Sequence, residues 1–130
     1  MAFDLSGKLS KKMMSDPKFR EALDESKRVH LRTFGEILEP AFTDDPTGEI
    51  ELVGALNFIS RGEYDKALRK LLRIEKRCAC PEDTCAVQFF AGLAYERSGM
   101  TVPAIQRFFA SAAAVPGHYM THVMLARLLH

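Results

Sequence analysis

The feature that most constrains the fold of this chain is an internal repeat. Positions 37 residues apart carry similar side chains, as positions 55 and 92 do. The matching pairs are Ala55 and Gly92, Phe58 and Tyr95, Gly62 and Gly99, Ala67 and Ala104, and Leu71 and Phe108. Repetition at this kind of period is typical of supersecondary units that stack on their neighbours. The chain is therefore expected to be a row of similar units and not one irregular core.

The segments between the glycines favour helices. Apolar residues recur at three- and four-residue steps, Gly62 and Gly99 stand where helices should close, and proline follows Cys80 and Thr101 near two helix starts. No segment alternates convincingly with period two, so no sheet is expected. We predict an all-α chain with helices over residues 49–60, 64–77, 81–97 and 102–114, and a fifth from near His118 to the chain end.

The first 48 residues have a different pattern. Asp16 and Pro17 supply start signals, and apolar residues including Phe19, Leu23, Phe34 and Ile37 then recur at helical spacing. We predict a long amphipathic helix from about Asp16 to Leu38, ended by Pro40, and a loop over residues 43–48, TDDPTG. The predicted organisation is thus 1–48 as tail, helix and linker, and 49–130 as repeats.

The repeat resembles the tetratricopeptide family, whose unit is a helical hairpin of 34 residues. The second unit carries Gly92, Tyr95, Gly99, Ala104, Phe108, Ser111 and Pro116 at the family's spacing, and the first carries Ala55, Phe58, Gly62, Tyr64, Ala67 and Leu71. An insertion of three residues, within RCACPEDTC, accounts for the longer period. The resemblance implies an α-solenoid of two full hairpins and the first helix of a third, and no catalysis.

Small residues explain the pattern physically. Gly92 and Ala104 allow the two helices of a hairpin to approach closely, and Tyr95 and Phe108 fill the space beside them. Pro116 stops the second helix.

The resemblance also implies a concave groove, lined by the first helix of each hairpin, that binds a protein segment. Mapped by spacing, the candidate groove residues are Leu52, Leu56, Ile59, Phe89, Leu93, Glu96, Arg97, Met120, Val123 and Arg127. Leucines at 52 and 56 argue against the family's clamp for a chaperone's terminal carboxylate, which needs cationic and amide residues there. The apolar floor leaves two alternatives: it binds a hydrophobic partner segment, or the predicted N-terminal helix fills it.

Other residues suggest little chemistry. Cys78, Cys80 and Cys85, with His118 as a fourth ligand, lack the usual zinc spacing. His118 and His122 lack the acidic base of a metalloprotease helix, so both are interpreted as surface or packing residues. The basic stripe of α-helical spacing from Lys66 to Arg77 has no nucleic-acid motif around it and is interpreted as a solvated face. No phosphate loop or nucleophile motif appears, so we expect no enzyme, no cofactor, no metal and no nucleic-acid partner.

Composition fits a cytoplasmic interaction protein. The net charge is +1, the cysteine count of 3 is odd, and the first residues lack a signal peptide's apolar run, so neither membrane binding nor a disulfide framework is expected. The last helix is apolar around most of its surface, which indicates a fragment of a longer repeat protein, a homodimer, or a covering N-terminal helix. We predict an adaptor or scaffold; the alternatives are a type III secretion-like tetratricopeptide chaperone and a self-associating oligomerisation module.

Overall fold

The computed structural model describes residues 17, 18, 21 and 40–130 of the chain. This part contains five α-helices and no strand: α3 (Pro46–Ser60), α4 (Tyr64–Glu75), α5 (Pro81–Arg97), α6 (Thr101–Ala114) and α7 (Tyr119–Leu128). The predicted all-α class is therefore confirmed for the described residues. The predicted helix from Asp16 to Leu38 lies outside them, apart from Pro17, Lys18 and Glu21, which are helical.

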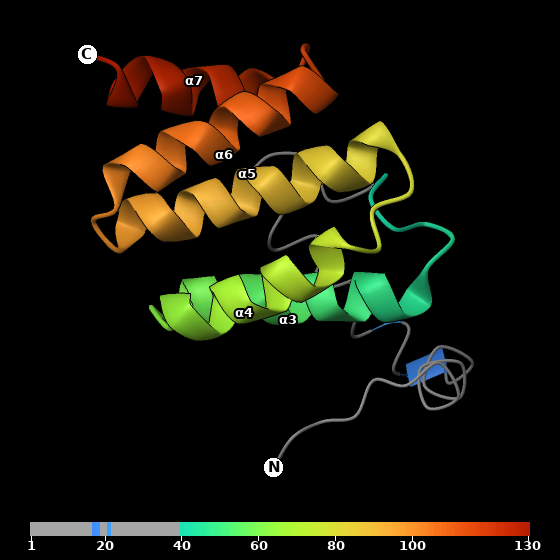
Figure 1. Ribbon diagram of the computed structural model, residues 1–130. Coiled ribbons are helices and arrows are strands. Elements are labelled where there is room, and N and C mark those ends of the chain that lie inside the picture. Colours follow the sequence, from blue (N-terminus) through green and yellow to red (C-terminus); the bar gives the residue numbers. More distant parts are fainter. Residues whose placement is uncertain (1–16, 19–20, 22–39) are drawn as a thin grey trace.

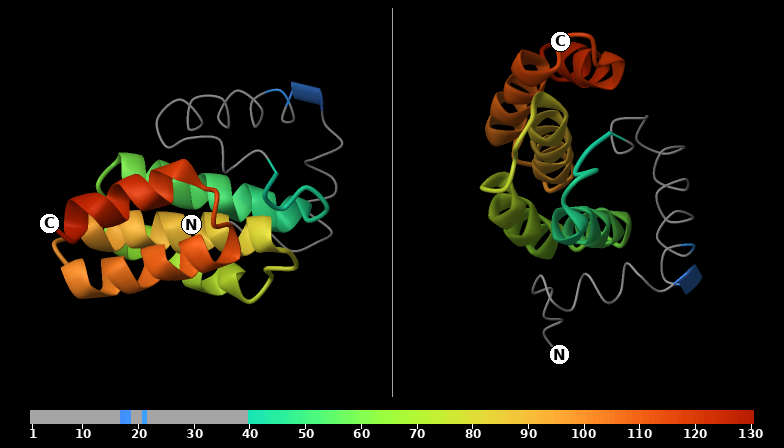
Figure 2. Two further views of the ribbon diagram at one scale, coloured as in Figure 1. Left: turned by 90° about the horizontal axis from the view of Figure 1, so that it is seen from above. Right: turned by 90° about the vertical axis from the view of Figure 1, so that its right-hand side faces the viewer.

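The helices are stacked in chain order (Figure 1), with α3 and α4 at one end and α7 at the other. Each helix packs chiefly against the one before and the one after it. Seen end-on in the right-hand view of Figure 2, α4 and α6 lie on one side of the stack and α3, α5 and α7 on the other. The described residues therefore form two layers of helices.

The helix boundaries follow the start and stop signals with one exception. Gly62 and Gly99 have φ angles of 77° and 85°, so both close a helix in the left-handed conformation as predicted. Helix α5 begins at Pro81, after Cys80. Glu82 and Asp83 in its first turn are negatively charged and interact favourably with the positive end of the helix dipole.

The exception is the predicted loop over residues 43–48, which is wrong for its second half. Helix α3 begins at Pro46, and the Asp45 side chain accepts a hydrogen bond from the Gly48 N–H at 3.1 Å. An Asp-Pro pair is a strong helix start, because the carboxylate caps and the proline occupies the first helical position. A Cβ on Gly48 would lie 2.6 Å from Phe42 Cδ1, so this glycine makes room for the preceding turn and is not a loop signal.

The repeat is visible in which residues are buried. On α4 the buried positions are Ala67, Leu71 and Ile74, and on α6 they are Ala104, Phe108 and Ser111, each 37 residues later. Spacings of four and three residues put each trio on one helical face. The two helices therefore turn equivalent faces toward the core.

Helix α5 approaches α6 closely at Gly92. A Cβ built there would lie 2.9 Å from two ring carbons of Phe108, whose side chain is fully buried. Phe108 also meets Phe89 edge to face, with ring centroids 5.6 Å apart. In the first hairpin the equivalent positions hold Ala55 and Leu71. There the leucine is smaller than phenylalanine, and the residue opposite it is an alanine, which has a Cβ.

A polar network ties three helices together beside this core. Arg107 on α6 donates to Glu75 Oε2 on α4 at 2.5 Å and to Gln88 Oε1 on α5 at 3.0 Å. Gln88 Nε2 also donates to the Glu75 carboxylate, at 2.6 Å. Because each group satisfies the other two, the network fixes the register of α4, α5 and α6.

We expect the Gly92→Ala substitution to lower the free energy of unfolding by about 1–2 kcal/mol, because the added methyl overpacks the core against Phe108. The double variant Gly92→Ala with Phe108→Leu copies the first hairpin, and the two changes should be coupled by about 1 kcal/mol in a urea-unfolding double-mutant cycle. Gly117→Ala is the control, because a Cβ there meets nothing within 4 Å. Strictly additive effects would show that positions 92 and 108 do not pack against one another.

Candidate functional site

Half of the predicted groove residues belong to the core. Leu52, Leu56, Ile59, Phe89 and Leu93 are at most 5% exposed. The reason is that α3 and α5 are buried around most of their circumference: every residue from 85 to 94 is buried. In the structure these five side chains are not open to solvent, and their role in a groove stays a prediction. The alternative in which the N-terminal helix fills the groove falls outside the described residues.

The other five predicted groove residues remain accessible and lie toward the C-terminal end of the stack. Glu96 on α5 pairs with Arg127 on α7 at 2.6 Å, so the structure does bring these two together. Met120 and Val123 on α7 are half-buried, and Arg97 at the end of α5 is exposed. We call these five residues the α5–α7 face: Glu96, Arg97, Met120, Val123 and Arg127.

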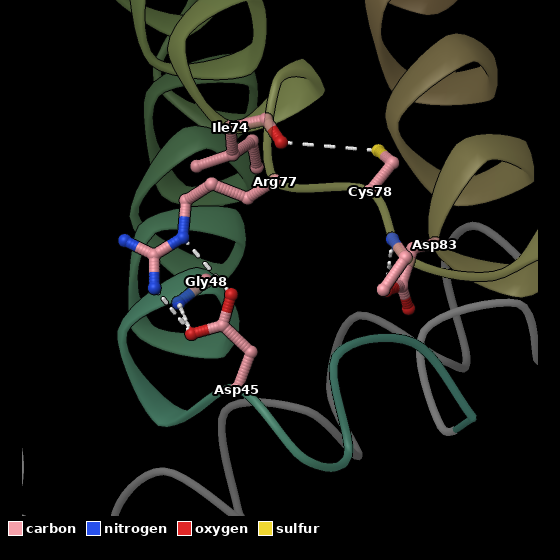
Figure 3. A network of polar contacts seen from close by, with 7 residues as sticks. Asp45, Gly48, Ile74, Arg77, Cys78 and Asp83 are labelled. Atoms are coloured by element: carbon pink, nitrogen blue, oxygen red, sulfur yellow. Dashed lines mark hydrogen bonds and ion pairs between the residues drawn. The ribbon is translucent and has the colours of Figure 1, made fainter.

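A second polar site lies where the chain enters the stack (Figure 3). Arg77, just after α4, points its guanidinium at the carboxylate of Asp45 and donates to both oxygens, with Nε at 2.9 Å from Oδ2. The same carboxylate caps α3 through Gly48. Two-point recognition of a carboxylate by arginine is geometrically specific, so this pair joins the start of α3 to the end of α4.

Asp83 makes a parallel connection from the first turn of α5. Its buried carboxylate accepts from the backbone N–H of Phe42 at 2.6 Å and of Ala79 at 3.3 Å. Phe42 is a non-glycine residue with φ of 57°, a conformation that costs about 1 kcal/mol or more and needs support from its surroundings. The short bond to Asp83 and the full burial of the Phe42 side chain supply that support.

The three cysteines do not form a metal site. Cys78 Sγ points toward the Ile74 carbonyl oxygen at 3.8 Å (Figure 3), and Cys85 Sγ lies 3.2 Å from Ser111 Oγ. Within the described part of the chain, no group of three or more His, Cys, Asp or Glu side chains could hold a metal ion. Burial is the main cause that raises the pKa of Cys78 to about 11, and it also raises the pKa of Cys85, so both thiols are protonated and unreactive at neutral pH.

A shallow hollow of about 660 Å³ lies beside these thiols. Its walls come from the α4–α5 connection and from the last turns of α6, and they are mostly small side chains: Cys78, Ala79, Cys80, Pro81, Thr84, Ala110, Ala113 and Ala114. It has no charged side chain to orient a ligand, so its chemistry is limited to weak apolar contact.

The basic stripe on α4 is solvent-facing but partly neutralised. Lys66 pairs with Glu63 at 3.3 Å, Arg73 with Glu51 at 3.6 Å, and Arg77 with Asp45. Three cationic side chains, Arg61, Lys66 and Lys70, also surround the ring of Phe58 at 5.1–6.0 Å. These contacts give most of the cations a structural role, in line with a solvated face.

The polar cluster that holds α7 was missed by the sequence analysis. Ser111 Oγ on α6 lies 3.0 Å from Thr121 Oγ1, which lies 2.7 Å from His118 Nδ1. Ser111 and Thr121 are both fully buried. The signal that could have revealed it is the repeat itself, because Ser111 stands 37 residues after the buried Ile74 and so places a hydroxyl at a core position.

The far side of the stack end carries exposed apolar side chains. Val102 and Phe109 on α6 are 66% and 53% exposed, and Leu129, just after α7, is 58% exposed. Positions 102, 105 and 109 share one face of α6, so Ile105 extends the same surface. We call Val102, Ile105 and Phe109 the α6 apolar residues.

Comparison with known proteins assigns no family. No protein-family model matches the chain, and no curated protein or solved structure is significantly similar to it. Among the described residues, no helix combines the length and the apolar character that crossing a membrane requires.

We expect Asp83→Asn to lower the free energy of unfolding by about 1–3 kcal/mol, because it weakens the acceptor of two backbone N–H groups and releases the strained Phe42. Chemical unfolding monitored by circular dichroism measures the change. Glu82→Gln is the matched control, since it removes a charge from the same helix turn at an exposed position and should cost at most about 0.5 kcal/mol. Equal effects of the two variants would contradict a specific role for Asp83.

Proposed function

We propose that this chain is a tetratricopeptide-like adaptor that binds a segment of a partner protein and catalyses no reaction. The observation that carries the proposal is the close approach of α5 and α6 at Gly92 beside Phe108, at the two positions where the resemblance requires a small and a large residue. The equivalent left-handed glycines, Gly62 and Gly99, and the equivalent buried faces of α4 and α6 support it further.

The partner segment would bind on the α5–α7 face. Met120 and Val123 offer apolar surface that is still partly accessible, and the charged side chains of Glu96, Arg97 and Arg127 border it. Apolar contact contributes most of the affinity in such a site, whereas the flanking charges set orientation and register. The partner segment is therefore expected to combine apolar anchors with charged groups of both signs.

The test is selection of peptides from a random library on the purified protein, followed by amide chemical-shift mapping. We expect selected peptides to perturb α7 around Met120 and Val123, and Val123→Asp to weaken their binding at least about tenfold, because a carboxylate would be desolvated in the contact. Gln106→Asp, at an exposed position of α6, is the control and should leave binding unchanged. Peptides that map to another surface, or that bind both variants equally, would overturn this site.

One observation favours a second candidate, a self-associating module. Phe109 and Leu129 are more than half exposed, and exposed apolar surface of this kind is typical of protein contacts. Here the α6 apolar residues of two copies would pack together.

Light scattering coupled to size-exclusion chromatography distinguishes the candidates. If the module self-associates, the wild-type mass should rise with concentration toward a dimer, and Phe109→Glu should restore the monomer because it buries a charge in the contact. Leu72→Glu adds the same charge at an exposed apolar position of α4 and should leave the dimer intact. A monomer at all concentrations would exclude self-association and leave the adaptor proposal.

A further inference from the structure

The start of α7 is capped by a histidine. His118 is the N-cap residue, and its Nδ1 accepts a hydrogen bond from the backbone N–H of Thr121 at 3.3 Å. The same Nδ1 lies 2.7 Å from the Thr121 hydroxyl. The ring is half-buried and meets the face of Phe89 on α5 edge-on, with centroids 5.2 Å apart.

This geometry specifies the protonation state of the imidazole. A backbone N–H can only donate, so Nδ1 must present a lone pair to Thr121. The ring is then neutral, with its proton on Nε2. A chain of hydroxyls then connects the ring to α5: the Thr121 hydroxyl donates to Nδ1, Ser111 donates to the Cys85 carbonyl oxygen at 3.1 Å, and the Cys85 thiol donates to Ser111.

Protonation of Nδ1 breaks this arrangement. The new N–H would face the N–H of Thr121, and that backbone group would lose its acceptor. The Thr121 hydroxyl would have to turn its proton from Nδ1 to Ser111 Oγ, 3.0 Å away, so that Nδ1 could donate to Thr121. The imidazolium would also place a positive charge at the positive end of the α7 dipole.

Helix α7 packs chiefly against α6, and its buried side chains are Thr121, Met124 and Leu125. Met120 and Leu128 add partly buried apolar contact, and His122 Nε2 lies 2.5 Å from the Pro116 carbonyl oxygen. Its ion pair to α5 joins Arg127, which is 62% exposed, to Glu96, and an exposed pair contributes little to stability. A helix of 10 residues has marginal stability without tertiary contacts. The seat of α7, meaning its packed position on α6, therefore depends strongly on the histidine cap and the buried hydroxyl groups at its start.

We propose that His118 is a pH-dependent latch: protonation at Nδ1 removes the cap of α7 and releases this helix from α6. The latch acts on the chain alone and needs no partner. Release would uncover Met124 and Leu125 together with the buried side of α6 that they cover, and it would dismantle the α5–α7 face.

Burial and a neighbouring histidine favour the neutral form of the His118 ring. Burial first, and then the nearby His122, lower the pKa of His118 below its ordinary value of 6.5. The titratable groups that face it are His122 on α7 and, through the hydroxyl chain, Cys85 on α5, with Glu82 acting on that thiol; α6 contributes the Ser111 hydroxyl. The released state binds the proton more readily, so the seat is fully stable above about pH 6.5 and weakens as pH falls through the lowered pKa.

Hydrogen exchange measured by mass spectrometry on the full chain tests the latch. Labelling at about pH 7.5 and about pH 5.5 is scaled to the intrinsic exchange rate at each pH. We expect the protection of α7 amides to fall by up to about tenfold at the lower pH, the most that one titrating histidine can give over this range, while α5 keeps its protection. His118→Asn supplies an amide oxygen that caps a helix but does not titrate, so this variant should keep α7 protected at both pH values.

His122→Asn is the matched control. It removes the other histidine of the same segment but leaves the latch, so α7 should still lose protection in acid. A wild-type α7 that stays protected at the lower pH, or a His118→Asn variant that loses protection as the wild type does, would overturn the proposal. Should His118→Asn fail to fold, an NMR titration of the wild type decides: the His118 ring and the α7 amides must share one midpoint, and two separate midpoints would overturn the latch.

Discussion

The stack depends on the contact between Gly92 and Phe108. Because the glycine has no Cβ, α6 lies close against α5, and the ring of Phe108 fills the gap beside Phe89. Once this contact fixes α6, Ser111 lies one turn further along the same buried face, at the position that Ile74 occupies in the first hairpin. A polar residue at that core position needs partners, and Cys85 and Thr121 supply them. The close packing at Gly92 thus places Ser111 where it can hydrogen-bond to Thr121 at the start of α7.

The sequence predicted helix identity and punctuation well, because these depend on local chemistry. Pro81, Gly62 and Gly99 act through their own backbone restrictions, so their roles follow from residue type alone. The start of α3 was misplaced because Asp-Pro-Thr-Gly was taken as turn composition, although Asp45 and Pro46 are a cap and a first helical residue. Gly48 there serves a contact with Phe42, and no local pattern reveals a contact of that kind.

The groove prediction at the central helices depends on information that the repeat does not contain. Repeat spacing tells which side chains of α3 and α5 share a face, but not whether that face is covered. Leu52, Leu56, Ile59, Phe89 and Leu93 share the predicted face and are all enclosed in the core. Toward the end of the stack, where α7 is the last helix, the same spacing does mark accessible residues such as Val123 and Arg127. The accessible residues of the predicted site lie in its C-terminal half, and binding there would require α7 to be in place.

That requirement connects the proposed binding surface to the chemistry at the start of α7. Earlier helices are held by large apolar side chains and by the Glu75, Gln88 and Arg107 network. The start of helix α7 is instead held by hydrogen bonds among hydroxyl groups and a neutral imidazole. The sequence analysis took His118 for a surface or packing residue, since a histidine cap has no distinctive spacing. A stack whose last helix is held by a histidine cap would respond to mild acid at that end while its core stays intact, because stability differs from one element to the next.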